Sequence, residues 1–353
     1  MKPTQLMEAL DVCRKAGRAP NIQGPPGGGK SSIVRQYADK IDYALLLLDL
    51  PMIYDPVDTR GIPANVDGKT TWLPPEYLHF NGKPTVVFVD DYGICPPTSQ
   101  ANLMGLFLSR RIGGHELPES TFVIAAGNRI TDAAAVHATP SALGNRMTWL
   151  KLSVDLSDWC SWALANDVET SVIAFHRFSG GTNLYPMFND GDTPHKCGMC
   201  DKNLQPGELC GQCLRNNQAF PTLRSWTFVS DMLKHKPSPA VESDLIAGNV
   251  GIAKATEFIG YLKMYRQLPS LDSILLGPKV APVPKDPAAM YAVATALGRM
   301  ATPNNLDTVC QYLDRVPPEF SVLTMRDATQ RDKDLTSTRA FAQWGTKHAD
   351  VLL

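Results

Sequence analysis

The sequence predicts an α/β fold, with a parallel sheet and helices over the first 152 residues and a mainly helical region after them. Three observations lead to this prediction. Short apolar segments alternate with helical segments between residues 19 and 152, and a glycine-rich motif follows the first of them. From about residue 153 the strand signal fades while helical periodicity continues, interrupted by a four-cysteine stretch at 197–213.

The apolar segments of the first part lack a strict alternation of polar and apolar residues. Such runs are typical of strands that are buried on both faces of a parallel sheet. Five segments have this character: APNIQ (19–23), YALLLLDL (43–50), TVVFVD (85–90), TFVIAA (121–126) and MTWLKL (147–152).

The region after residue 153 contains a series of amphipathic helix candidates. Ser153 or Asp155 is the expected N-cap of the first one. Residues 179–220 are rich in Gly, Pro, Asn and Asp, which predicts loops there. The helix candidates are 155–167, 168–178, 222–233, 249–268, 286–300, 304–316 and 336–353.

Composition restricts the class of protein. The 353 residues, 44% hydrophobic and 20% charged, are typical of a globular chain with two or three structural units. A net charge of -1 argues against a broad basic field for non-specific nucleic-acid binding. The longest apolar run, YALLLLDL, is too short to cross a bilayer, so we expect no membrane association and a cytoplasmic location.

The glycine-rich motif GPPGGGKS, residues 24–31, fits the phosphate-binding P-loop and lies between a strand and a helix. Its glycines allow backbone N–H groups to point at phosphate oxygens, the lysine adds a positive charge near the β and γ phosphates, and the serine hydroxyl can bind Mg²⁺. We therefore expect ATP or GTP binding. The predicted nucleotide contacts are Gly24, Pro25, Gly27, Gly28, Gly29, Lys30, Ser31 and Ser32.

Asp90 ends the third apolar segment and Asp91 follows it directly. Both aspartates should reach the sheet edge beside the P-loop. Asp90 is the predicted partner of Ser31 in holding Mg²⁺. Asp91 is the predicted general base that activates the attacking water. Comparable ATPases usually carry Glu at this position, and the shorter Asp side chain leaves the rate of hydrolysis open.

Four cysteines, Cys197, Cys200, Cys210 and Cys213, form two Cys-Gly-x-Cys pairs. This pattern is typical of a tetrahedral Zn²⁺ site with four thiolate ligands, which is closed and therefore structural. A redox pair or an iron–sulfur cluster is the alternative. Whether the zinc only stiffens the segment or also offers a docking surface stays open.

The order of these features resembles the AAA+ ATPases, and among them the MoxR-like branch. After the P-loop and Asp90–Asp91, TFVIAAGN ends in Asn128, which matches the family's sensor 1 residue. ALGNRM supplies Arg146 at the place of the arginine finger, and PTLRSW supplies Arg224 at the place of the sensor 2 arginine. Residues 55–78 and 109–120 match two insertions of this branch, a loop and a hairpin with Gly113-Gly114 at its turn.

The resemblance implies a nucleotide-binding domain over residues 1–152, a helical lid over 153–270 that includes a zinc-binding insertion at 190–216, and a helical extension over 271–353. It also implies a homo-oligomeric ring, usually a hexamer, because the arginine finger of one subunit acts on the nucleotide of its neighbour. In the family, catalysis consists mainly of positioning groups and neutralising charge on the γ-phosphate.

The preferred functional prediction is a Mg²⁺-dependent ATPase of MoxR type that remodels or matures protein partners. The resemblance alone adds a candidate partner, a protein carrying a von Willebrand factor A domain. Two alternatives stay open: a nucleic-acid-dependent motor or loader, and a nucleotide-binding assembly switch with weak hydrolysis. Neither the substrate nor the ring size follows from the sequence.

Overall fold

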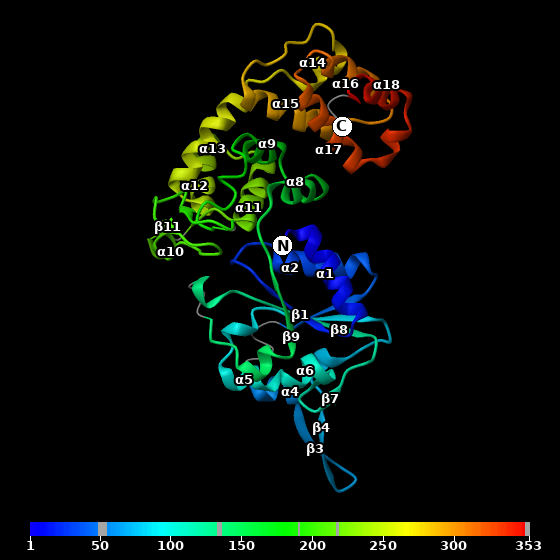
Figure 1. Ribbon diagram of the computed structural model, residues 1–353, viewed down its shortest axis with the longest axis vertical. Helices are drawn as coiled ribbons and strands as arrows, with labels where there is room; N and C mark the ends of the chain where they lie inside the picture. The colour runs from blue at the N-terminus through cyan, green and yellow to red at the C-terminus, as the bar shows by residue number, and fades with distance from the viewer. Residues whose placement is uncertain (49–54, 133–135, 190, 217–218, 350–353) are drawn as a thin grey trace. The chain divides into compact units, whose positions relative to one another are not determined.

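The computed structural model describes residues 1–48, 55–132, 136–189, 191–216 and 219–349. The chain forms two compact units (Figure 1). The first unit comprises Met1–Val154 and Met187–Arg215, and the second comprises Asp155–Pro186 and Asn216–Leu353. Each unit is described by itself below.

A five-stranded parallel sheet forms the centre of the first unit, in the order β2-β5-β8-β1-β9. All five strands predicted from apolar runs are therefore confirmed. They are β1 (Ala19–Gln23), β2 (Ala44–Leu48), β5 (Thr85–Val89), β8 (Thr121–Gly127) and β9 (Met147–Lys151).

Both faces of this sheet are buried, as the lack of alternation predicted. Val86 and Phe88 of β5 pack in one apolar cluster with α1 (Pro3–Lys15) and α2 (Lys30–Lys40). Val87 and Val89 pack in a second cluster, on the other face, with Leu103 and with Leu106 and Phe107 of α6. The remaining helices of this region are short: α4 (Pro56–Arg60), α5 (Pro97–Asn102), α6 (Met104–Ser109) and α7 (Ser141–Gly144).

Two hairpins project from the loops of the first unit. The segment 55–78, expected as a loop, contains α4 and a hairpin of β3 (Ile62–Val66) and β4 (Lys69–Leu73) that extends away from the sheet (Figure 1). The second hairpin, β6 (Arg111–Ile112) and β7 (His115–Glu116), lies where the sequence predicted it. Its turn residues Gly113 and Gly114 have φ of 59° and 99°, which glycine adopts without strain.

The second unit is helical, and each helix candidate after residue 153 is confirmed over the residues that the structure describes. Residues 350–353 of the last candidate lie outside the described residues. Asp155, one of the two expected N-caps, accepts a hydrogen bond from the Asp158 backbone N–H at 2.9 Å. The helices are α8 (Leu156–Ala165), α9 (Thr170–Phe178), α11 (Leu223–Lys234), α12 (Pro239–Val250), α13 (Ile252–Tyr265), α14 (Leu271–Leu276), α15 (Pro287–Met300), α16 (Leu306–Leu313), α17 (Pro318–Arg331) and α18 (Arg339–Lys347).

Helices α12, α14 and α17 of the second unit were not predicted. The inner face of α17 contains polar residues, Ser321, Thr324 and Asp327, which are buried against other helices. Apolar periodicity cannot detect a face of this kind. Asp327 forms a buried two-pronged ion pair with Arg177 of α9, so a paired charge replaces an apolar contact.

The four-cysteine segment, Met187–Arg215, contains β10 (His195–Lys196), β11 (Asn203–Leu204) and most of α10 (Gly211–Asn216). The sequence reasoning placed it in the helical lid, whereas Met187–Arg215 groups with the α/β unit. Chain order alone does not reveal this grouping, because the contacts of a loop-rich insertion depend on where its few apolar side chains pack. In the described part of the chain, no helix is both long and apolar enough to cross a membrane.

Candidate functional site

The P-loop joins β1 to α2 and has a backbone that only its glycines permit. Gly27 and Gly29 have φ of 71° and 91°, and Gly29 is the N-cap of α2. A Cβ at Gly28 would lie 3.0 Å from the carbonyl oxygen of Pro25, and one at Gly24 would lie 3.2 Å from Cβ of Leu152. The loop is therefore folded tightly at the N-terminus of α2, where backbone N–H groups favour anions.

Lys30, the first residue of α2, is buried and directs its ammonium group back across the loop. Nζ donates hydrogen bonds to the carbonyl oxygens of Gly24 at 2.9 Å and Pro25 at 3.1 Å, and to Oδ1 of Asn128 at 2.7 Å. These three acceptors use the three N–H donors of the ammonium group, so an incoming phosphate oxygen would replace one of them. Ser32, the last predicted contact, is exposed and accepts a hydrogen bond from Gln36.

Ser31 and Asp90 lie in direct contact at the carboxyl end of the sheet. Ser31 Oγ donates a hydrogen bond to Oδ2 of Asp90 at 2.5 Å. Burial of the Asp90 carboxyl raises its pKa, and the hydrogen bond from Ser31 opposes that effect. A hydroxyl beside a partly desolvated carboxylate matches the oxygen ligands that Mg²⁺ prefers next to bound phosphates.

Asp91 and Asn128 are joined by a hydrogen bond from Asn128 Nδ2 to Asp91 Oδ1 at 3.1 Å. Asp91 has a left-handed backbone, with φ of 49°, as the chain turns from β5 into a short 3-10 helix at Tyr92–Ile94. Asn128 directly follows β8, the neighbour of β5. The structure therefore brings together Lys30, Asp91 and Asn128, which the sequence predicted as separate parts of one site.

The two predicted arginines have no hydrogen bond or ion pair with these residues within the described parts of their own units. Arg146, between α7 and β9, donates a hydrogen bond to the Ala142 carbonyl at 2.8 Å, and within the described residues it has no hydrogen bond or ion pair with the P-loop. Arg224 is exposed in the first turn of α11, in the second unit. A positive charge is unfavourable near a helix N-terminus, so helix stability does not explain an arginine there.

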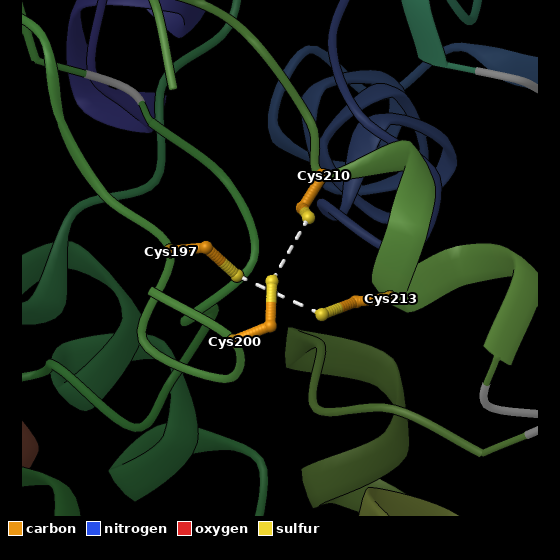
Figure 2. Close-up of side chains that lie close together, drawn as sticks. All are labelled: Cys197, Cys200, Cys210 and Cys213. Atoms are coloured by element: carbon orange, nitrogen blue, oxygen red, sulfur yellow. Dashed lines mark hydrogen bonds between the residues drawn. The ribbon is translucent and has the colours of Figure 1, made fainter. Parts of the chain in front are cut away.

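The four cysteines converge on one point (Figure 2). Their sulfur atoms all lie within 4.8 Å of one another, with 3.8 Å between Cys197 and Cys213 and 3.6 Å between Cys200 and Cys210. A tetrahedral zinc site with Zn–S bonds of about 2.3 Å places sulfurs about 3.8 Å apart, whereas a disulfide requires about 2 Å. The arrangement therefore fits a metal ion with four thiolate ligands.

The environments of these thiols differ. Cys197, Cys210 and Cys213 are buried and Cys200 is exposed. Burial raises the pKa of Cys197 and Cys213, whereas a hydrogen bond from the Lys202 backbone lowers the pKa of Cys200. A positive metal ion would offset the cost of burying the thiolates of Cys197 and Cys213.

Sequence reasoning missed a residue next to the nucleotide site. Arg129, directly after Asn128, forms an ion pair with Asp132 and lies over the ring of Phe188 in the four-cysteine segment. The spacing of Arg129 and Asp132 was visible in the sequence, but nothing in the sequence connected Arg129 to Phe188.

Comparisons with known proteins find only distant similarity. No protein-family model and no curated protein matches the chain. Among solved structures, the chain is similar to a mutant of RuvB from Thermotoga maritima, with 16% identity over 84% of this chain and 81% of that chain and a TM-score of 0.37.

Two further structures are similar over most of the chain. A putative ATPase from Cytophaga hutchinsonii has 12% identity, covers 92% of this chain and 79% of that chain, and has a TM-score of 0.35. NtrX from Brucella abortus has 12% identity, covers 98% of this chain and 67% of that chain, and has a TM-score of 0.35. These similarities are distant and do not by themselves indicate what the chain does.

Proposed function

We propose that this protein is a Mg²⁺-dependent ATPase of the AAA+ type, in its MoxR-like branch, which acts as a homo-oligomeric ring to remodel or mature protein partners. One observation carries the proposal. Asn128 bonds to both Lys30 and Asp91, beside the Ser31–Asp90 pair, so the groups that bind phosphate, hold Mg²⁺ and activate water lie at one sheet edge.

We propose a role for each group in phosphoryl transfer. The N–H groups of the loop and the Lys30 ammonium would hold the β and γ phosphates, while Ser31 and Asp90 would hold the Mg²⁺ that accompanies ATP. Asp91 would accept a proton from the attacking water, and Asn128 would orient that water or the γ-phosphate. The reaction then depends mainly on positioning and charge neutralisation.

The ring is proposed from Arg146 and from the family resemblance. The Arg146 side chain is only partly buried, and among the described residues its hydrogen-bond partner is the Ala142 carbonyl of its own loop, so it could reach a nucleotide bound to a neighbouring subunit. Arg224 would report nucleotide state from the helical unit. A hexamer, and a protein partner with a von Willebrand factor A domain, follow from resemblance alone.

We also propose that Cys197, Cys200, Cys210 and Cys213 bind Zn²⁺. The ion supplies a crosslink that holds together a segment with few apolar residues of its own. Four thiolates leave no coordination position for a substrate, so this site is structural.

A second candidate is a nucleotide-dependent assembly switch that hydrolyses ATP slowly. The specific observation is Asp91, whose carboxylate is one methylene shorter than the usual Glu and is already bonded by Asn128. Rates of phosphate release distinguish the two candidates.

The test is Mg²⁺-dependent ATP hydrolysis by the purified chain, compared with Lys30→Ala and Asn128→Ala. Lys30→Ala should weaken ATP binding about tenfold to a hundredfold, since hydrogen bonds to charged groups contribute about 1.5–3 kcal/mol. Asn128→Ala should weaken ATP binding only a few-fold and lower kcat about a hundredfold or more. Hydrolysis that is equal in all three proteins contradicts the proposed site, and stimulation by DNA or RNA would favour a nucleic-acid motor.

A further inference from the structure

We propose that Arg129 is a positioning residue that couples the four-cysteine segment to Asn128, so that metal binding at the cysteines controls ATP turnover. This inference depends on the proposed function for the role of Asn128. It is carried by a continuous series of contacts within the first unit, from Cys210 to the Lys30–Asn128–Asp91 network.

The first link holds Arg129 in place beside Asn128. The Arg129 backbone N–H donates to Oδ2 of Asp132 at 2.8 Å, and the guanidinium donates to Oδ1 at 2.6 Å from Nη2 and 3.1 Å from Nε. Asp132 is buried, with 1% of its surface exposed. A carboxylate that binds both the backbone and the side chain of one arginine fixes the chain where Asn128 leaves β8.

The second link joins Arg129 to the four-cysteine segment. The guanidinium carbon lies 4.9 Å from the centre of the Phe188 ring, a cation–π contact, and the Phe188 side chain is buried. Gly207 approaches from the same segment: a Cβ there would lie 3.1 Å from Arg129 Nη1. The arginine is thus held by its own loop through Asp132 and contacted by two parts of the four-cysteine segment.

The third link runs from Phe188 to a cysteine. Phe188 pairs with Leu209 in an antiparallel bridge, and the Cys210 backbone N–H donates to the Met187 carbonyl at 2.8 Å. The flanking Asn189 is fully buried and its side chain donates to the carbonyls of Thr193 and Leu204. Phe188 is therefore held by the segment Leu209–Cys210, and a metal ion would tie that segment to the other three cysteines.

These contacts predict what loss of the metal does. When Cys210 is released, the Phe188–Leu209 pair loses its anchor and Arg129 loses its contact with the ring. Asn128 is the next residue along the chain, and a displacement of about 1 Å in a catalytic group can lower a rate about a hundredfold. Asn128 is also bonded to Lys30, so loss of the metal should weaken ATP binding as well as turnover. Coupling between two binding sites is reciprocal, and bound ATP should therefore strengthen metal binding.

The experiment uses the full chain loaded with Zn²⁺. Phe188→Leu removes the ring face, Phe188→Tyr keeps it, and Phe178→Leu, at an exposed phenylalanine of the second unit, is the matched control. We expect Phe188→Leu to lower kcat about tenfold and to raise KM for ATP about fivefold, and Phe188→Tyr and Phe178→Leu to resemble the wild type. Zinc content and the thermal unfolding midpoint check that each variant is folded.

A second readout does not depend on hydrolysis. The affinity for Zn²⁺ is measured by competition with a chromogenic chelator, in the presence of ADP or of a slowly hydrolysed ATP analogue. We expect the analogue to raise the affinity of the wild type about fivefold or more, and to have no such effect in Phe188→Leu or in Arg129→Lys, which keeps the charge but loses the planar fork.

Equal Zn²⁺ affinity with both nucleotides in the wild type, or normal kcat in a folded Phe188→Leu protein, would overturn the coupling. If Phe188→Leu does not fold, Arg129→Lys decides by the same two readouts. A wild type that binds the analogue without hydrolysing ATP would contradict the proposed function alone, because the nucleotide-dependent Zn²⁺ affinity still tests the coupling.

Discussion

Lys30 donates a hydrogen bond from Nζ to Oδ1 of Asn128 at 2.7 Å, which joins the start of α2 to the end of β8. Asn128 in turn donates to Asp91 from its amide nitrogen. The Asn128 amide therefore bonds through its oxygen to the proposed phosphate-binding lysine and through its nitrogen to the proposed base. In the proposed function, a change at the phosphates would reach Asp91 through this amide.

Asp91→Asn should abolish most ATP hydrolysis and keep ATP binding. The substitution preserves size but removes the proton acceptor, and general base catalysis contributes about a hundredfold to ten-thousandfold. Single-turnover rates and titration with a fluorescent ATP analogue separate the two effects. An unchanged rate in Asp91→Asn would show that Asp91 is not the base, while faster hydrolysis in Asp91→Glu would show that side-chain length limits the wild type.

Arg146→Ala should leave nucleotide affinity unchanged and remove hydrolysis in the assembled ring. The reason is that its guanidinium contacts only its own loop within the described chain and would act on a neighbouring subunit. The measurement is specific activity as a function of protein concentration, with the assembly state followed by light scattering. If the monomer hydrolyses ATP as fast as the oligomer does, the proposed role of Arg146 is wrong.

One Zn²⁺ ion per chain should co-purify with the protein and be lost in Cys210→Ser. Cys210 is fully buried, and loss of one of four ligands weakens a closed site while leaving a polar group in its place. Elemental analysis gives the metal content, and the thermal unfolding midpoint should fall. Cys310→Ser, at a half-buried cysteine outside the cluster, is the control and should keep the metal. Iron in place of zinc would favour the iron–sulfur alternative.

His176 should make the helical unit less stable at acidic pH. Its ring is fully buried between Trp159, Phe175 and Trp226, and neither ring nitrogen has a hydrogen-bond partner in the described structure. Burial lowers the pKa of His176 to about 3. In the unfolded chain this histidine takes up a proton near pH 6.5. The contribution of His176 to the free energy of unfolding is therefore fully present above about pH 6.5 and falls by about 1.4 kcal/mol per pH unit toward pH 3.

The measurement is urea unfolding at pH 7 and pH 4.5, with the free energy of unfolding compared between wild type and His176→Phe. Phenylalanine keeps an aromatic ring in the cluster and cannot take up a proton, so the variant should lose this part of the pH dependence. The same slope in both proteins would assign the acid sensitivity to other groups.

The strands, the phosphate loop and the cysteine pairs could be read from the sequence because each depends on residues close together in the chain. Apolar runs predicted all five strands of the sheet, and the glycine pattern predicted a tight loop before a helix, in which Gly27 and Gly29 have left-handed backbones. Helix α17 could not be predicted in this way, since its buried face is polar and Asp327 is compensated by Arg177, which is distant in sequence.

The sequence by itself determined which side chains are available for phosphate, magnesium and zinc. Only the tertiary structure decided that Asn128 bridges Lys30 and Asp91, and that the four-cysteine segment packs with the α/β unit through Phe188 and Arg129. The physical reason is that local conformation follows from neighbouring residues, whereas a contact between distant segments depends on how whole strands and loops pack. In the four-cysteine segment, which has few apolar residues, the cation–π contact between Phe188 and Arg129 contributes to that packing.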